Sequence, residues 1–315
     1  MSATSRQTGG LGVVVLTHGP RGEYRPLVDA LVEQGVPGSA IALVQNPVDP
    51  SDPQPAPPAE GAAVIRMDRN RAYAGGMNAG IRHHLARGAE LILLATQDLR
   101  LRPGAVAELL AAAERVPEYG VLGPLLWLRG ERRIFSGGGR RGRRGGWVSH
   151  LRERPVAGPD GIAECDWVDG AAIMVRRAVL ERVGLLDDSL FIYFEETDLC
   201  LRAQRHGWRV GVVVEAEGEQ ESGQPARPGF HAYLISRNGF EFARRANGLV
   251  GVVATIRRGL VESFELLRAY PGTGRAERAA IRIKLAGMWL GFLDFLRRRF
   301  GPPPERLARL GQDRY

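Results

Sequence analysis

Short runs of aliphatic residues alternate with segments of helical pattern along the first 215 residues. The runs are short and rich in β-branched residues, which favours strands, and they occupy residues 13–16, 41–44, 63–67, 91–95, 171–175 and 210–214. Helical patterns lie over residues 26–34, 178–183 and 197–206. Strand, helix and strand in this order predict parallel βαβ units, so the expected fold class is α/β with a parallel sheet.

The pattern changes near residue 247. Residues 249–270 and 279–300 carry apolar side chains at helical spacing with arginines between them, and a Pro-Gly turn at 271–274 separates the two segments. This spacing predicts two amphipathic helices outside the main sheet. We therefore expect an α/β domain over residues 1–246 and a C-terminal amphipathic helical extension over residues 247–315.

Composition adds a charge asymmetry. The chain is 44% hydrophobic and 25% charged, which is typical of globular proteins and excludes wholesale disorder. Residues 241–315 hold 15 Lys and Arg against 7 Asp and Glu, and this surplus accounts for the whole net charge of +8. The extension shows no recognisable nucleic-acid-binding module, so we expect no nucleic-acid partner. Its basic helices fit an anionic membrane surface, while their apolar faces also fit packing on the domain or on a second subunit.

The apolar runs of the sequence predict neither a membrane-spanning helix nor a signal peptide. The apolar run Leu285–Leu293 is too short to span a membrane, and Leu11–Leu16 is too short for a signal peptide. Cys165 and Cys200 fit neither a disulfide framework nor a paired metal-ligand spacing, so we expect buried thiols. These features predict a cytoplasmic protein, with peripheral contact at the inner face of the membrane as an option.

Acidic residues stand at two places where chemistry is expected. Asp98 follows the predicted strand 91–95, at the strand end where open α/β sheets bind ligands, although an exposed turn aspartate fits the pattern equally. Glu195, Glu196 and Asp198 begin a predicted helix, whose dipole favours acids there, and Asp198 can pair with Arg202. The preceding aromatic run places the two glutamates beside apolar groups, where a carboxylate can act as a general base.

The glycine-rich residues 74–80 predict a turn whose backbone approaches a phosphate or ribose before opening a helix. Their spacing matches neither a dinucleotide fingerprint nor a phosphate-binding loop. His83 and His84, which follow on that helix, have no third ligand at a metal spacing, so we expect both at the surface.

In order, these pieces resemble the family 2 inverting glycosyltransferases, in particular the rhamnosyltransferase-like bacterial members with the GT-A fold. The resemblance implies an α/β fold with a Rossmann-like open mixed sheet flanked by helices. The resemblance covers about residues 11–245. Residues 70–80 (NRAYAGGMNAG) match the family pattern Asn-x-Gly-Phe-Ala-Gly-Gly-x-Asn-x-Gly. Residues 166–210 contain WVDGA at 167–171, VGLLD at 183–187 and YFEETDLCLR at 193–202. The last is similar to the family's Tyr-Phe-Glu-Asp-x-Asp-Leu-Cys-x-Arg.

The resemblance implies a hexosyl- or deoxyhexosyltransferase that uses a nucleotide-diphosphate sugar. It implies that Glu196 is the general base, with Glu195 and Asp169 in the catalytic group. The residues implied in nucleotide binding are Thr17, Gln45, Asn46, Asn70, Gly75, Gly76, Asn78 and Asp98. Asp98 would also hold Mg²⁺ or Mn²⁺. A uracil or thymine base is expected, because the Gln45 amide can pair with N3–H and O4. The acceptor can be a saccharide, a lipid-linked sugar or a small molecule.

The chain departs from the family pattern at several positions. Glu196 replaces the usual Asp, Gln45 replaces a base-reading Asp, and the segment Thr96–Asp98 retains one acid of the metal motif. A late histidine of the metal site has no counterpart at 213–222, where Glu217 or Glu219 could supply oxygens. The basic side chains near residues 140–144 could neutralise the leaving diphosphate instead, or lie on a solvated surface segment.

Two other classes of sugar-nucleotide-binding protein share features with this sequence. The single lysine, Lys284, argues against sugar nucleotidyltransferases, which need one early in the chain. A non-catalytic GT-A-like subunit that binds a sugar nucleotide stays open because the metal motif is reduced.

Overall fold

The computed structural model of the chain describes residues 10–18, 23–47, 51–53, 55–142, 147–221, 228–304 and 307. Its contacts define two compact units. Unit 1 comprises Met1–Arg140, Ser149–Asp188 and Glu195–Ser222, and unit 2 comprises Arg141–Val148, Ser189–Phe194 and Gly223–Tyr315.

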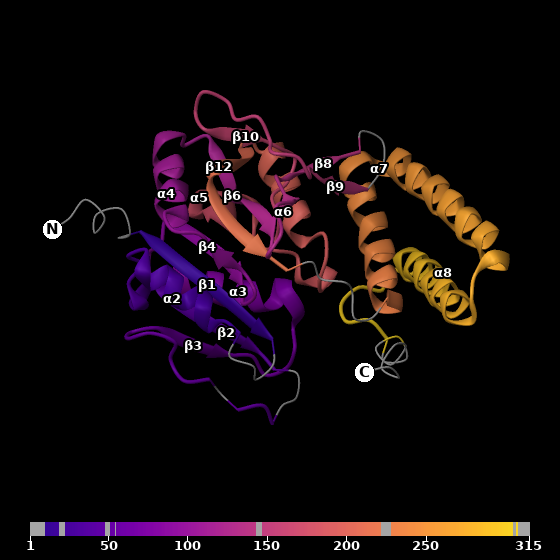
Figure 1. The fold of residues 1–315 in the computed structure, drawn as a ribbon, viewed down its shortest axis with the longest axis horizontal. Coiled ribbons are helices and arrows are strands. Elements are labelled where there is room, and N and C mark those ends of the chain that lie inside the picture. The colour runs from indigo at the N-terminus through magenta and orange to yellow at the C-terminus, as the bar shows by residue number, and fades with distance from the viewer. Residues whose placement is uncertain are drawn as a thin grey trace. The chain divides into compact units, whose positions relative to one another are not determined.

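Unit 1 is built on one mixed sheet with the order β10-β12-β6-β11-β4-β1-β2-β3, while β5 pairs with β12 and β7 with β6. The strands are β1 Leu11–His18, β2 Ile41–Asn46, β3 Ala63–Arg66, β4 Leu91–Thr96, β5 Arg100–Leu101, β6 Tyr119–Leu128, β7 Ile134–Ser136, β10 Ile162–Glu164, β11 Ala172–Arg176 and β12 Arg209–Gln220. β1, β2, β3 and β4 run parallel, whereas β11 is antiparallel to both β4 and β6. The expected open mixed sheet is confirmed (Figure 1).

Five helices accompany the sheet in the described part of unit 1: α2 Arg25–Glu33, α3 Ala72–Leu85, α4 Ala105–Arg115, α5 Arg177–Val183 and α6 Glu195–Arg205. The core lies between sheet and helices, and its centre is formed by fully buried aliphatic side chains such as Val13, Leu27, Leu43 and Leu93. The predicted strands and helices are present, but other elements, among them α4 and the ten-residue strand β6, were not predicted. β12 also extends to Gln220, six residues beyond the expected end. A β-bulge between Val213 and Glu217 redirects this strand.

Helix α3 lies unusually close to β1. A Cβ at Gly80 would stand 2.3 Å from Val14 Cγ1, so only glycine allows this approach. The same closeness corrects the expectation for His84, which is buried rather than at the surface, and whose Nε2 lies 3.0 Å from the Val13 carbonyl oxygen. Burial lowers the pKa of His84, which favours the neutral ring.

The Arg- and Gly-rich segment 129–154 contains a two-stranded pairing. β8, Gly139–Arg141, pairs with β9, Val148–His150, in a separate two-stranded sheet. Of the basic side chains named above, Arg140 and Arg141 are described, and Arg143 and Arg144 lie outside the described residues.

Unit 2 is mainly helical. α7 runs from Pro228 to Ala269 but is interrupted at Gly248, whose φ of 59° is left-handed, and α8 spans Arg275–Leu296. Both expected amphipathic helices are present, although helical structure begins 21 residues before the expected start. The domain boundary expected after residue 246 falls inside α7 and stays a prediction. In the part of the chain that the structure describes, no helix is both long and apolar enough to cross a membrane.

The loop Ser189–Phe194 of unit 2 has an unusual backbone. Phe191, Tyr193 and Phe194 have φ values of 71°, 74° and 75°, a left-handed conformation that is rare for bulky residues. Asn238, fully buried in α7, holds this loop: its Nδ2 donates to the carbonyl oxygens of Leu190, Ile192 and Tyr193, each at 2.9 Å. The loop leads directly into Glu195.

Candidate functional site

Polar residues gather where the parallel strands of unit 1 end. In the strand register, Thr17 of β1 lies beside Gln45 of β2, and Leu16 lies beside Thr96 of β4. This carboxyl edge is where open α/β sheets bind their ligands. The structure therefore brings three separate stretches of the predicted nucleotide site to one edge of the sheet.

Gln97 links the ends of β1 and β4. Thr17 Oγ1 donates to Gln97 Oε1 at 2.5 Å, and the backbone N–H of His18 donates to the same oxygen at 3.0 Å. Gln97 Nε2 in turn donates to Glu23 Oε2 at 2.9 Å. Thr17 is thus fixed in place by a residue that the sequence pattern did not single out.

Gln45 is buried at the end of β2, and only the nitrogen of its side-chain amide forms a hydrogen bond. Its Nε2 donates to the Pro53 carbonyl oxygen at 2.8 Å, while its Oε1 is buried and has no hydrogen-bond partner. Buried polar atoms are normally paired, so an unpaired acceptor here is available to a ligand donor.

Asn46 and Asn70 shape the turn before α3. Asn46 accepts from the Arg71 N–H at 3.2 Å and donates to the Ala72 carbonyl oxygen at 2.5 Å. Asn70 accepts from the Ala72 N–H at 2.8 Å, and Ala72 has a left-handed φ of 52°. These two side chains therefore hold a strained backbone at the edge of the sheet.

The glycine-rich segment differs from the expected turn because residues 72–80 are already helical. A Cβ at Gly76 would stand 2.5 Å from Leu16 Cδ1, and one at Gly75 would stand 2.6 Å from Arg71 Cβ. Asn78 is buried and exchanges hydrogen bonds of 2.8 and 3.1 Å with the backbone of Leu186. In this structure these residues seat α3 on the sheet, and their contact with a nucleotide stays a prediction.

Asp98 is half-buried just beyond β4. Gln220 Nε2 donates to Asp98 Oδ2 at 2.6 Å, and Arg129 donates to the Asp98 carbonyl oxygen. Glu217 and Glu219, the other expected oxygen ligands, are both paired with Arg102. No group of three or more His, Cys, Asp or Glu suited to a metal ion occurs among the described residues. A divalent ion would fit at Asp98 only with further ligands from a bound molecule, such as phosphate oxygens.

The carboxylates of Glu195, Glu196 and Asp169 form an acidic group around Tyr73. The Tyr73 hydroxyl donates to the Gly170 carbonyl oxygen at 2.6 Å, and these three carboxylates together with burial raise its pKa. A Cβ at Gly170 would lie 3.8 Å from Glu196 Cγ. The predicted catalytic residues are therefore brought together in unit 1.

The surroundings of Glu196 raise the pKa of its carboxyl group. Burial, reinforced by the negative charge of Asp169, raises the pKa of Glu196 to about 7. Glu195 is more deeply buried, one of its oxygens has no hydrogen-bond partner, and burial raises its pKa well above the ordinary value. With a pKa of about 7, Glu196 can exchange a proton near neutral pH, whereas burial favours the neutral form of Glu195.

Asp169 is half-buried, with an aromatic group nearby. Its Oδ1 accepts from the Ala171 N–H at 2.9 Å, and its Oδ2 lies 3.7 Å from His150 Nδ1. Burial raises the pKa of Asp169 and lowers that of His150, so each charged form is disfavoured. The His150 ring stacks edge-on against Trp167 at 4.7 Å between centroids.

Asp198 has a structural role, as one interpretation expected. Its carboxylate is buried and accepts from Arg202 Nε at 2.7 Å. Arg202 also donates to the carbonyl oxygens of Val183 and Leu185 at 2.6 and 2.9 Å. This pair ties α6 to the turn after α5.

Several residues of the site were not anticipated: Tyr73, Gln97, Arg129, His150 and Gln220. Tyr73 and Gln97 lie within motifs already quoted, so their position was a usable signal. The Gln220–Asp98 contact joins residues 122 positions apart and has no local signature.

The structure has the GT-A fold of glycosyltransferases. The mannosyltransferase PcManGT of Pyrobaculum calidifontis, solved with GDP-Man and Mn²⁺, superposes with a TM-score of 0.54 at 14% identity, over 92% of this chain and 88% of that one. At that identity the similarity shows the fold alone. No protein-family profile matches the chain.

Sequence relatives are more specific. The N-acetylglucosaminyl-diphospho-decaprenol L-rhamnosyltransferase of Mycobacterium tuberculosis is 27% identical over 244 residues, which cover 66% of this chain and 74% of that protein. The low-salt glycan biosynthesis hexosyltransferase Agl10 of Haloferax volcanii is 27% identical over 175 residues, 54% of this chain. The matched region spans only 56% of the length of Agl10. The expected similarity to rhamnosyltransferase-like GT-A enzymes is thereby confirmed.

Proposed function

We propose that this chain transfers a sugar from a nucleotide-diphosphate donor to an acceptor hydroxyl, with inversion at the anomeric carbon and Glu196 as the general base. The observation that carries the proposal is the position of Glu196, beside Asp169 and Tyr73, with a pKa raised to about 7. The similarity to rhamnosyl- and hexosyltransferases supports the same class of reaction.

In the proposed step, Glu196 accepts the proton of the acceptor hydroxyl as its oxygen attacks the anomeric carbon. The new carbon–oxygen bond forms on the face opposite the diphosphate, and the bond to the diphosphate oxygen breaks with its electron pair leaving on that oxygen. The nearby charge of Asp169 strengthens Glu196 as a base, because it disfavours a second negative charge.

Donor recognition is proposed for the edge that contains Thr17 and Gln45. The unpaired Oε1 of Gln45 can accept from N3–H of uracil or thymine. Its Nε2 already donates to Pro53, and its second hydrogen can serve O4. We therefore favour UDP- or dTDP-linked donors, and a clear preference for a purine diphosphate in binding assays would contradict this assignment.

Charge on the departing diphosphate needs a cation. Asp98 would hold Mg²⁺ or Mn²⁺ together with the donor phosphates, and a bound ion would supply this neutralisation. Arg129 donates a hydrogen bond to the carbonyl oxygen of Asp98 and is a second source of positive charge at this place. Arg140 stays a candidate for the same role.

The acceptor class follows from the relative rather than from the site. The mycobacterial relative is named for a diphospho-decaprenol-linked acceptor. We propose a lipid-linked saccharide for this chain on that basis, and a free saccharide or small molecule as the alternatives.

The test replaces Glu196 by Gln, which keeps the size of the side chain but cannot accept the proton. Transfer should fall by about 10²–10⁴-fold while donor binding stays near that of the wild type. Glu114→Gln, on the exposed face of α4, is the matched control.

Retained turnover in Glu196→Gln would assign the base elsewhere, with Glu195 the first to test. A product that keeps the donor's anomeric configuration would refute inversion, and donor binding without turnover in the wild type would favour a non-catalytic binding subunit.

A further inference from the structure

The second half of α7 in unit 2, Leu249–Ala269, exposes an extended series of large apolar side chains. Each is between 50% and 81% exposed, and together they form what we call the apolar stripe: Leu249, Val250, Val253, Leu260, Val261, Phe264 and Leu267. Single exposed apolar residues are ordinary, but a continuous set is typical of a binding surface.

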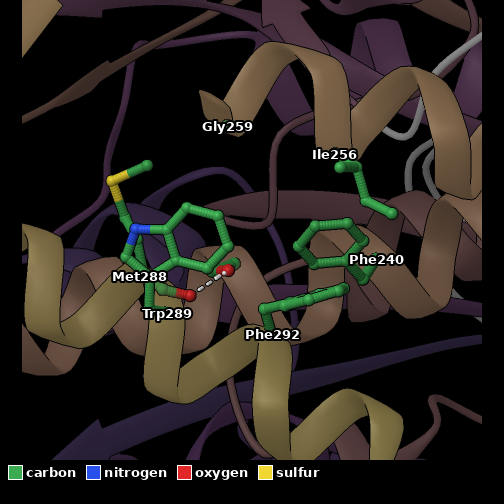
Figure 2. Close-up of a pocket in the computed structure, with 7 residues that line it drawn as sticks. Phe240, Ile256, Gly259, Met288, Trp289 and Phe292 are labelled. Atoms are coloured by element: carbon green, nitrogen blue, oxygen red, sulfur yellow. Dashed lines mark hydrogen bonds between the residues drawn. The ribbon is translucent and has the colours of Figure 1, made fainter. Parts of the chain in front are cut away.

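Helical geometry places the stripe on one face. At 3.6 residues per turn, its seven members fall within about 120° of arc around the helix axis. The side toward α8 is different: Ile256 and Gly259 line a small pocket with Trp289 and Phe292 of α8 (Figure 2). α8 therefore covers the other side of α7 and leaves the stripe open.

Positive charge accompanies the stripe. Arg257 and Arg268 are exposed and fall within the same arc, while Glu262 and Glu265 lie outside it. Residues 249–304 hold ten Lys and Arg against four Asp and Glu. Arginine can lay its aliphatic stem along an apolar surface and keep its guanidinium in a polar layer.

We infer that the apolar stripe binds the surface of an anionic lipid bilayer. The helix would lie in the plane of the interface, with its apolar side chains at the boundary between headgroups and acyl chains and its guanidinium groups beside lipid phosphates. A second copy of the chain fits less well, because two stripes in contact would bring two positively charged faces together. The inference concerns unit 2 alone and does not depend on the proposed transfer reaction.

The test measures co-sedimentation of the full-length protein with vesicles. Vesicles of phosphatidylcholine with about one third phosphatidylglycerol should bind the protein, and pure phosphatidylcholine vesicles should bind it about tenfold or more weakly. High salt should weaken binding to the anionic vesicles, because the electrostatic part is screened.

Variants separate the apolar and charged contributions. Val253→Glu should weaken vesicle binding by about tenfold or more. The matched control is Val156→Glu in unit 1, which introduces the same charge at a residue that is 93% exposed. The double variant Arg257→Gln/Arg268→Gln should lose about 30-fold, and Arg182→Gln, exposed on α5, should lose little. Unchanged circular dichroism and melting curves confirm that each variant is folded.

Three results would overturn the inference. The wild type could fail to bind anionic vesicles, or Val156→Glu could weaken binding as much as Val253→Glu does. Light scattering could also show a dimer that Val253→Glu converts to monomers without changing vesicle binding, which would assign the stripe to self-association.

Discussion

The hydroxyl of Tyr73 donates a 2.6 Å hydrogen bond to the carbonyl oxygen of Gly170, which joins the start of α3 to the loop that contains Asp169. Both residues lie beside Glu196. The contact thus connects the glycine-rich segment to the acidic group that we propose is catalytic.

Tyr73→Phe tests this connection. The variant keeps the ring and leaves the Gly170 carbonyl oxygen without its donor, which should cost about 1–3 kcal/mol of unfolding free energy. Urea unfolding measures the loss, and Tyr270→Phe in unit 2 is the control. We also expect reduced transfer, because the loop bearing Asp169 loses an anchor. Equal stability of Tyr73→Phe and wild type would show that this hydrogen bond is dispensable.

Glu196 should reduce the stability of the native state at alkaline pH. Its native pKa of about 7 exceeds the ordinary glutamate value of 4.5, so between these values the folded protein holds a proton that the unfolded chain has released. Stability should therefore fall as pH rises from 4.5 to 7. Since each unit of pKa corresponds to about 1.4 kcal/mol, Glu196→Gln should be more stable than wild type by about 3 kcal/mol at pH 8.

The same variant should show a much smaller difference near pH 4, where the carboxyl is protonated in both states. Thermal melts of both proteins across this range provide the measurement, and no substrate is needed. A stability difference that does not change with pH would refute the raised pKa.

Asn238→Ala should destabilise unit 2. It removes the donor to three carbonyl oxygens of the left-handed loop Ser189–Phe194, and unpaired buried polar groups cost about 1–3 kcal/mol each. Hydrogen exchange in residues 189–194 should increase. Ser236→Ala removes one 2.7 Å hydrogen bond from α7 to the carbonyl oxygen of Met288 in α8. It should have a smaller effect on stability and on this exchange. Unchanged exchange in the loop would show that other contacts hold its conformation.

The sequence predicts the short, apolar strands, such as Val13–Leu16, but it misses the ten-residue strand β6, whose run is interrupted by Gly120, Gly123 and Pro124. It predicts the position of Glu196 because that residue belongs to a contiguous motif. It fails where distance in sequence hides proximity: nothing local indicates that Gln220 contacts Asp98, or that His150 reaches Asp169. The glycines of residues 74–80 leave two interpretations open from sequence, since close helix–sheet packing and phosphate binding require the same absence of a side chain.

The expected metal site is where this sequence departs furthest from the family pattern. Asp98 is the one acid retained from the motif, and its Oδ2 already accepts a hydrogen bond from Gln220. We expect Mn²⁺ to bind weakly to the protein alone and more tightly when UDP or dTDP is present, because phosphate oxygens complete the coordination. Isothermal titration with and without nucleotide measures the difference.

Asp98→Ala should weaken metal binding, and it should weaken nucleotide binding measured with Mn²⁺ present by up to about 5–150-fold, because the bound ion and the nucleotide stabilise each other. Gln220→Ala is the informative companion: it releases the Asp98 carboxylate, so metal affinity should hold or rise while the fold at the end of β12 loosens. If excess chelator leaves transfer unchanged, the ion is dispensable and positive side chains must neutralise the diphosphate. Arg129 is then the first residue to replace, because it contacts Asp98 directly, followed by Arg140.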